Sequence, residues 1–320
     1  MNCLCCGKAI TPNASESEKK WQWHKKCIKR FFYTDEMPVL DITKDQLELL
    51  ANKTVNEGLT VPGVQKKLSL HLSSDINARL TIVDYPTGYI LKPQTEEFEN
   101  MPEFEDLAMR LAETMGIQTV PHALIKMHEE YAYITKRIDR DIREKEINLY
   151  AMEDFCQLSY RLTQDKYKGS YEQCGRIIKK YSIMPGLDMS ELFLRVAGSF
   201  VMGNSDMHLK NFSLRETEPG NRKFQMSKAY DMLPVNVIMP EDKEQLALTI
   251  NGKKRNIHKK EFRKFAESCD ISLKAAENML KKICTQEQKL LKQVDKAYLS
   301  EEQKDKVKQL IQERIKILSQ

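Results

Sequence analysis

Apolar and polar residues alternate in short stretches of the first half of the chain, a pattern typical of half-buried β-strands. The clearest stretch is 68–72, where leucines occupy every second position after turn-forming residues at 62–63. Further short strands are predicted over residues 80–83, 89–91, 123–127 and 131–135. Apolar residues at helical spacing predict one amphipathic helix, from near Pro102 to Met115.

The second half, from about residue 150, carries mainly helical apolar spacing. Apolar residues from Leu192 to Val201 predict a buried helix that runs directly into Gly203. Strand-like pieces at 212–214 and 224–226 flank turn residues and predict a hairpin that returns the chain to Asp231. Apolar residues beyond Asp270 predict terminal amphipathic helices. The chain is therefore expected to be an α+β protein.

Composition and charge narrow the class of protein. The 320 residues suffice for one large or two modest domains, and 51 Lys and Arg against 46 Asp and Glu give only a mild positive excess. This balance is no signature of nucleic-acid binding. No apolar run reaches the length of a membrane span, and the N-terminus lacks the apolar core of a signal peptide. We therefore expect a cytoplasmic protein that binds neither membranes nor nucleic acid directly.

Half of the eight cysteines crowd near the N-terminus, in a spacing that predicts a metal site. Cys3 and Cys6 form one ligand pair, and His24 and Cys27 form a second pair about eighteen residues later. Structural zinc sites favour a closed tetrahedron of sulfur and nitrogen, and so small a segment needs the metal to hold its shape. We predict a structural zinc site; the alternatives are an unmetallated, frayed terminus or a site in which Cys5 replaces a neighbour.

A polar loop after the buried helix carries a pattern typical of phosphotransferases. Asp206 is followed five positions later by Asn211, with His208 and Lys210 between them, and Asp231 comes at the end of the predicted hairpin. In protein kinases an aspartate accepts the substrate hydroxyl proton, and an asparagine and a later aspartate hold the metal ions. The alternative is a loop whose polar residues only cap neighbouring elements.

Two residues of the first half fit the same chemistry. Lys92 closes a predicted strand, where a lysine normally faces solvent but in a kinase binds the α- and β-phosphates. Glu105 lies in the first turn of the predicted helix, where the helix dipole alone would explain an acid. A kinase would instead use this glutamate to hold the strand lysine. Gly63 by itself is a weak phosphate-loop signal.

Several segments in a fixed order together resemble one family, the HipA-like serine/threonine kinases of bacterial toxin–antitoxin systems. The matching segments are 61–67, 90–93, 101–105, 109–112, 136–140, 153–157, 203–211 and 229–231, within roughly residues 58–255. The resemblance implies a two-lobed kinase-like fold with a strand-rich N-lobe and a helical C-lobe. The expected organisation is a zinc-binding module at 1–33, an ATP-binding N-lobe at 34–138 and a catalytic C-lobe at 139–320.

The resemblance also implies roles for individual residues. Asp206 would be the catalytic base, Asn211 and Asp231 the Mg²⁺ ligands, and Lys92 the residue that grips the ATP phosphates. Glu105 and Lys210 would support the site. Gly63, Val64, Gln65 and Lys67 would cover the ATP phosphates. Backbone groups of Lys136 and Ile138 would meet adenine, and Asp139 would lie near the ribose. His208 and Tyr230 would also lie close to ATP. Thr60 takes the place of the serine that the family autophosphorylates, and phosphate there would repel nucleotide.

Partners and substrate follow only from the family. The resemblance implies ATP and Mg²⁺ as cofactors and an aminoacyl-tRNA synthetase or another translation protein as substrate. The extra N-terminal subdomain of full-length members is missing, so a small separate partner supplying it, and a DNA-binding antitoxin, are expected. Met232-Leu233-Pro234 replaces the usual Phe-Gly after the metal aspartate. Two alternatives stay open: a lipid or small-molecule kinase, and an inactive kinase-like protein that docks partners through its zinc module.

Overall fold

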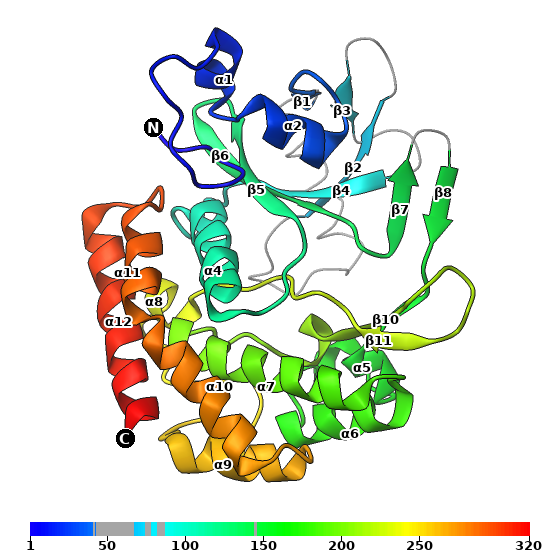
Figure 1. Cartoon of the computed structure of the whole chain (residues 1–320), viewed down its shortest axis with the longest axis vertical. Helices are drawn as coiled ribbons and strands as arrows, with labels where there is room; N and C mark the ends of the chain where they lie inside the picture. The colour runs from blue at the N-terminus through cyan, green and yellow to red at the C-terminus, as the bar shows by residue number, and fades with distance from the viewer. Residues whose placement is uncertain (41, 43–66, 74–77, 82–86, 144–145) are drawn as a thin grey trace. The chain divides into compact units, whose positions relative to one another are not determined.

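The computed structural model describes residues 1–40, 42, 67–73, 78–81, 87–143 and 146–320. The chain divides into two compact units (Figure 1). The first comprises Met1–Asp106 and Pro121–Asn148, and the second comprises Leu107–Val120 and Leu149–Gln320. Helix α4 (Met101–Met115) runs from the first unit into the second.

A six-stranded sheet forms the centre of the first unit, in the order β1-β3-β2-β4-β6-β5. Its strands are β1 (Val39–Leu40), β2 (Leu68–Leu72), β3 (Arg79–Thr81), β4 (Thr87–Lys92), β5 (His122–Met127) and β6 (Glu130–Lys136). All pairs are antiparallel except β1 with β3. Alternation places Leu68 and Leu70 in the interior and Ser69 at the surface, as predicted. A second small sheet pairs β7 (Arg140–Arg143) with β8 (Glu146–Leu149).

The N-terminal segment packs on this sheet through aromatic side chains. It contains the helices α1 (Glu16–Trp21) and α2 (Lys25–Phe32). The indole nitrogen of Trp23 donates to the carbonyl of Leu124 in β5 at 3.0 Å. Phe31 and Phe32 of α2 stack near Tyr89 of β4, with ring centroids 5.9 and 5.4 Å from the tyrosine ring. This segment therefore shares the hydrophobic core of the first unit.

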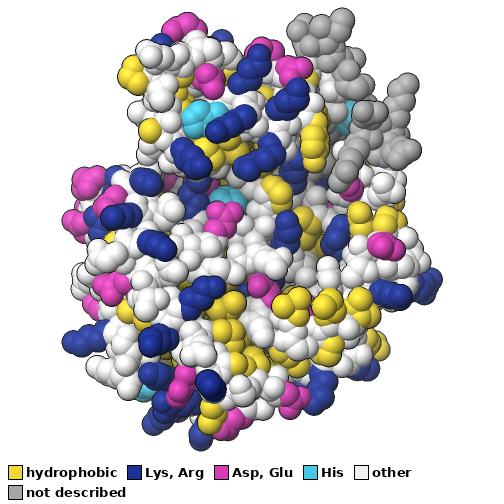
Figure 2. All heavy atoms as spheres, viewed as in Figure 1, with side chains coloured by type: hydrophobic (Ala, Val, Ile, Leu, Met, Phe, Trp, Pro, Cys, Tyr) yellow, Lys and Arg dark blue, Asp and Glu magenta, His cyan; other side chains and the backbone are white. Residues whose placement is uncertain are grey.

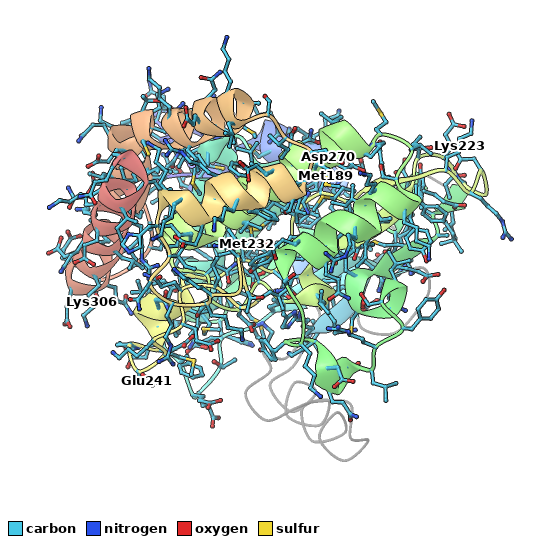
Figure 3. The ribbon with its side chains drawn as sticks, turned by 90° about the horizontal axis from the view of Figure 1, so that it is seen from below. Met189, Lys223, Met232, Glu241, Asp270 and Lys306 are labelled. Carbon is cyan, nitrogen blue, oxygen red and sulfur yellow. The ribbon has the colours of Figure 1, made fainter. Side chains whose placement is uncertain are left out.

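The second unit is mainly helical and is centred on α7 (Pro185–Met202). The other helices are α5 (Phe155–Leu158), η1 (Thr163–Asp165), α6 (Tyr171–Tyr181), η2 (Leu209–Asn211), α8 (Val235–Ile238), α9 (Lys259–Ser268), α10 (Leu273–Thr285), α11 (Glu287–Asp295) and α12 (Glu301–Ser319). Helix α7 begins with a proline at its first position and is buried along most of its length, as the apolar spacing predicts. Figure 3 shows Met189 and Met232 among these helices and Lys306 at the periphery of the unit.

A three-stranded antiparallel sheet completes the second unit, in the order β11-β10-β9. The predicted hairpin is present as β10 (Ser213–Glu216) and β11 (Phe224–Met226). The third strand, β9 (Met152–Asp154), is a correction to the helical pattern expected from residue 150. Three residues are too few for an alternation of apolar and polar positions to be recognisable. The strand matters because it brings Asp154 beside the polar loop.

The surface agrees with the mild charge balance of the sequence. Figure 2 shows basic and acidic side chains intermixed over the visible face, without one large field of a single sign. Within the described ranges, no helix combines the length and apolar character that crossing a bilayer requires.

Candidate active site

The polar loop begins where α7 ends at a left-handed glycine. Gly203 has φ 76°, and a Cβ atom there would lie 2.4 Å from a methyl carbon of Leu310. Any other residue would therefore be strained in its backbone and would clash with α12. The tight C-terminus turns the chain into residues 204–208 and then into η2, which ends at Asn211.

The three residues predicted as base and metal ligands lie together. The side-chain amide of Asn211 donates to the backbone carbonyl of Asp206 at 3.0 Å and to that of Asp231 at 3.5 Å. This leaves the side-chain oxygen of Asn211 as its atom for a cation. Asp231 has φ 60°, a left-handed conformation that aspartate tolerates better than most residues. The carboxylate of Asp231 and the amide oxygen of Asn211 are hard oxygen ligands of the kind that Mg²⁺ prefers, so the donor set fits the predicted metal.

Tyr167 is a residue of this site that sequence reasoning did not find. Its hydroxyl donates to Oδ1 of Asp206 at 2.5 Å, and its ring meets His208 edge to face at 5.0 Å between centroids. Burial and the negative charge of Asp206 raise the pKa of the Tyr167 hydroxyl, so the hydroxyl keeps its proton and donates this hydrogen bond at neutral pH. The neighbouring Tyr171 donates to the carbonyl of Met207 at 2.9 Å. The segment before α6 and the first residue of that helix thus hold the loop.

Lys210, predicted to support the site, and Tyr230, predicted to bind ATP, are joined by hydrogen bonds beside the loop. The ammonium of Lys210 pairs with Oδ2 of Asp154 at 2.8 Å. The hydroxyl of Tyr230 donates to the backbone carbonyl of Lys210 at 3.1 Å and lies 2.5 Å from the hydroxyl of Ser213. His208 is buried at the centre of the loop. Lys210 and Tyr230 are therefore brought together. The bond from the Tyr230 hydroxyl to the Lys210 carbonyl orders the backbone between Asp206 and Asn211.

In the first unit, Lys92 and Glu105 form a buried ion pair. Their charged atoms are 2.5 Å apart, and their side chains are 4% and 0% exposed. The ammonium also lies 5.4 Å from the centroid of the Tyr133 ring. Helix α4 begins at Met101 and Glu103 is the acid of its first turn, so the expectation that Glu105 occupies that turn is wrong. The helix-dipole explanation fails with it, and Lys92 is the partner of Glu105.

Breaking this pair is expected to destabilise the protein by about 3–5 kcal/mol, because one charge would stay buried without its counter-ion. Glu105→Leu makes this change, and urea denaturation measures it. The double variant Lys92→Met with Glu105→Leu should recover most of the loss, because an apolar pair of similar volume replaces the ions. A double variant as unstable as the single one would show that shape, and not charge, determines the cost.

The expected adenine and ribose positions surround the end of β6. The Lys136 N–H donates to the carbonyl of Pro121 at 3.1 Å, and its ammonium lies 3.9 Å from the centroid of the Tyr33 ring. Arg137 and Arg140 both bond to the carboxylate of Asp139, at 2.7 and 2.8 Å. Burial of Asp139 opposes ionisation, but the two arginines outweigh it and lower its pKa to about 2. The roles of Lys136, Ile138 and Asp139 toward nucleotide stay predictions.

The predicted phosphate-covering turn is described only at its end. Thr60, Gly63, Val64 and Gln65 lie outside the described residues. Lys67, directly before β2, is described and exposed.

The predicted zinc ligands converge in the first unit. One ligand atom from each of Cys3, Cys6, His24 and Cys27 lies within 4.8 Å of every other. A tetrahedral zinc site with bonds of about 2.0–2.3 Å separates its ligand atoms by roughly 3.5–3.8 Å. His24 Nδ1 lies 3.3 Å from the Cys6 sulfur and 3.9 Å from that of Cys27, while Nε2 is held by the carbonyl of Ala9 at 3.2 Å. The donor set and the held imidazole ring fit a structural zinc ion.

The local backbone explains why these four ligands meet. Gly7 adopts φ 66° and its N–H donates to the carbonyl of Cys3 at 2.8 Å, which closes the turn that carries the first pair. His24 is the N-cap of α2, so Cys27 projects from the first turn of that helix. Cys5 is buried but is not one of the four converging residues.

Comparison with known proteins places the body of the chain in one family. The profile of the HipA-like C-terminal domain matches residues 59–291, well over half of the chain. The chain belongs to the HipA-like C-terminal domain family. The match includes Lys92, Glu105 and the whole polar loop, whereas the cysteine-rich segment precedes it.

Relatives of this HipA-like chain carry kinase names. A protein named "Putative kinase" from Haemophilus influenzae is 27% identical over 56% of this chain and 54% of its own length. "Putative kinase Y4dM" from Sinorhizobium fredii is 30% identical over 67% of this chain and 54% of its own length. The chain therefore spans about half the length of the curated relatives that it matches.

Solved structures show the same HipA-like fold at low sequence identity. HipA in the complex of HipA, HipB and operator DNA from Shewanella oneidensis aligns with a TM-score of 0.67 at 18% identity, covering 81% of this chain and 64% of that one. The proinflammatory kinase CtkA of Helicobacter pylori aligns with a TM-score of 0.53 at 16% identity, covering 74% and 86%. The predicted α+β, kinase-like fold is confirmed.

Proposed function

We propose that this HipA-like protein is an ATP- and Mg²⁺-dependent serine/threonine protein kinase and the toxin of a toxin–antitoxin system. The observation that carries the proposal is the side chain of Asn211, which bonds to the backbone of both Asp206 and Asp231. A kinase needs these three groups at one place, whereas a loop whose polar residues only cap neighbouring elements does not. The kinase names of the relatives and the buried Lys92–Glu105 pair support the same conclusion.

The chemistry requires little covalent help from the protein. Asp206 would accept the proton of a serine or threonine hydroxyl as that oxygen forms its bond to the γ-phosphorus and the bond to the bridging oxygen of ADP breaks. Asn211 and Asp231 would hold Mg²⁺, which neutralises phosphate charge when bound. Lys92 would bind phosphate oxygens, with Glu105 setting the position of its ammonium. Rate acceleration would come from orientation and charge stabilisation.

Substrate and partners follow from the family and are part of the proposal. The Shewanella HipA structure is a complex with HipB and operator DNA, which supports a DNA-binding antitoxin as a partner of this chain. We propose a translation protein, such as an aminoacyl-tRNA synthetase, as the substrate. We also propose a small separate protein as a second partner. We also propose Thr60 as a site of autophosphorylation, where phosphate would add about −1.5 to −2 charges and repel nucleotide.

Phosphoproteomics of cells that express the wild type or Asp206→Ala tests the proposal. We expect a small set of serine or threonine sites on proteins to be phosphorylated only with the wild type, and Thr60 to gain phosphate when the purified chain is incubated with MgATP. Label transferred to lipid or a metabolite and to no protein would identify a small-molecule kinase instead. An Asp206→Ala variant that still inhibits growth would favour the inactive binding protein. An active preparation with unmodified Thr60 would remove only the autophosphorylation step.

A further inference from the structure

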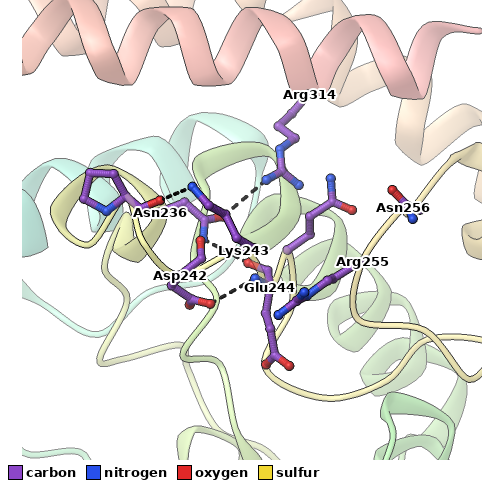
Figure 4. A pocket seen from close by; sticks show the side chains of 9 residues that line it. Asn236, Asp242, Lys243, Glu244, Arg255, Asn256 and Arg314 are labelled. Carbon is purple, nitrogen blue, oxygen red and sulfur yellow. Dashed lines mark hydrogen bonds between the residues drawn. The ribbon is translucent and has the colours of Figure 1, made fainter.

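A cavity of about 350 Å³ lies in the second unit, beside the segment that follows Asp231. Figure 4 shows it between this segment and α12, from which Arg314 points down toward Asn236. The residues that line it are Asn236, Pro240, Asp242, Lys243, Glu244, Gln245, Arg255, Asn256 and Arg314. Its volume is within the range of small-ligand sites in proteins.

Arg314 is a buried cation whose bonding capacity is not used up. Only 8% of the residue is exposed, and one guanidinium nitrogen donates to Oδ1 of Asn236 at 3.3 Å. The guanidinium lies 4.6 Å from the centroid of the Phe200 ring. Within the described parts of the chain, its Nη1 has no hydrogen-bond partner and no carboxylate forms an ion pair with it. Burial lowers the pKa of Arg314 to about 10, so the guanidinium stays charged at neutral pH.

The two carboxylates of the cavity are already engaged. Asp242 accepts from the hydroxyl of Ser205 at 2.6 Å and from the N–H of Glu244 at 2.9 Å. Glu244 pairs with the ammonium of Lys254 at 3.1 Å. Among the cations that line the cavity, Arg314 and Arg255 keep unused donors, while Lys243 bonds to the carbonyl of Pro240 at 2.6 Å. A buried cation with unused donors is costly unless an anion joins it.

We propose that this cavity binds a phosphomonoester group, held by Arg314 from within and by Arg255 at the mouth. Guanidinium groups present planar forks of N–H donors that match phosphate oxygens and form charge-assisted bonds to them. Arg255 is exposed and, in the described part of the chain, makes no hydrogen bond or ion pair of its own. It can therefore close on a ligand without losing an existing contact.

The cavity is connected to the polar loop through two of its lining side chains, Asn236 and Asp242, which both bond to Ser205. The amide of Asn236, whose oxygen accepts from Arg314, donates to the hydroxyl of Ser205 at 3.3 Å. Ser205 directly precedes Asp206. A ligand that orders Arg314 would therefore act, through Asn236, on the residue next to the proposed base.

Isothermal titration calorimetry of the full chain with inorganic phosphate and with O-phosphoserine tests the site without relying on kinase activity. We expect both to bind, acetate to bind more weakly, and Arg255→Gln to raise the phosphate Kd by about tenfold or more. Arg314→Gln should abolish binding. If that variant fails to fold, the exposed Arg255 still decides the question. Lys306→Gln, which removes an exposed charge on the same helix, should leave binding unchanged.

A phosphoserine peptide identifies the source of the group. Tighter binding of the peptide than of O-phosphoserine would assign the cavity to a phosphorylated protein segment, and equal or weaker binding to a small phosphate ester. Phosphate binding that is absent in the wild type, or the same in wild type and Arg255→Gln, overturns the proposal. Hydrogen exchange gives an independent readout, because bound phosphate should slow exchange at residues 236–245. Unchanged exchange there in the presence of saturating phosphate also overturns it.

Discussion

Asp206→Asn is expected to lower the rate of phosphoryl transfer by about 10²- to 10⁴-fold and to leave MgATP binding nearly unchanged. The amide has the size of the carboxylate and can still accept the hydrogen bond of the Tyr167 hydroxyl, so the loop should keep its shape. It cannot accept the proton of a substrate hydroxyl. The loss should therefore appear in kcat and not in the affinity for nucleotide.

Steady-state kinetics with MgATP, together with calorimetric titration of a non-hydrolysable ATP analogue, measures the two effects separately. Asp270→Asn is a matched control, since it makes the same chemical change at an exposed residue that pairs only with Lys179 among the described residues. Asp231→Asn should differ from Asp206→Asn by weakening Mg²⁺-dependent nucleotide binding itself. Undiminished phosphoryl transfer by the Asp206→Asn protein would contradict the proposed role of Asp206 as catalytic base and assign that role to another residue.

The polar loop could be predicted because its members are close in sequence or are returned by a hairpin with a clear turn. Asp206 and Asn211 lie on one loop, and β10 and β11 bring Asp231 back to it. Tyr167 could not be predicted, because it lies 39 residues before its partner in an irregular segment where no periodicity or motif points to it. The same holds for Asp154, which reaches Lys210 from the short strand β9.

For Glu105 the sequence left two explanations, and burial decides between them. An acid near the start of a helix is explained equally well by the dipole or by a distant lysine. The partner is thirteen residues away in β4, and both side chains are almost completely buried. Whether a charged residue is buried depends on the packing of a strand against a helix, which local spacing does not reveal. The roles of the site residues toward ATP and Mg²⁺ stay predictions.

The convergence of the four predicted zinc ligands was predictable from spacing alone, but the role of their segment in the first unit was not. Trp23 lies next to His24 and bonds to β5 across 101 residues of sequence. The rings of Phe31 and Phe32 extend this contact to Tyr89. The metal would therefore stabilise part of the core that also includes β4, the strand that ends at Lys92.

Removing the zinc ion is expected to unfold residues 1–33 and to expose Trp23, which is fully buried. Structural zinc in small modules contributes about 10–16 kcal/mol of apparent binding free energy at pH 7, comparable with the whole stability of a typical domain. Both tryptophans of the chain, Trp21 and Trp23, lie in this segment, so their fluorescence reports on it specifically. We expect Cys27→Ser, or a strong chelator on the wild type, to shift the emission to longer wavelength and to lower the unfolding temperature.

Metal analysis and two further cysteine variants make this expectation specific. The wild type should contain one zinc ion per chain and Cys27→Ser none, whereas Cys284→Ser, far from the cluster in sequence, should keep both the zinc and the emission. Cys5→Ser should also keep the metal, because Cys5 is not one of the four converging residues. Zinc lost from Cys5→Ser would place Cys5 in the site. A wild-type protein purified without chelator that holds no metal and keeps buried tryptophan emission would show that packing alone, through Trp23 and the α2 aromatics, holds the segment on the sheet.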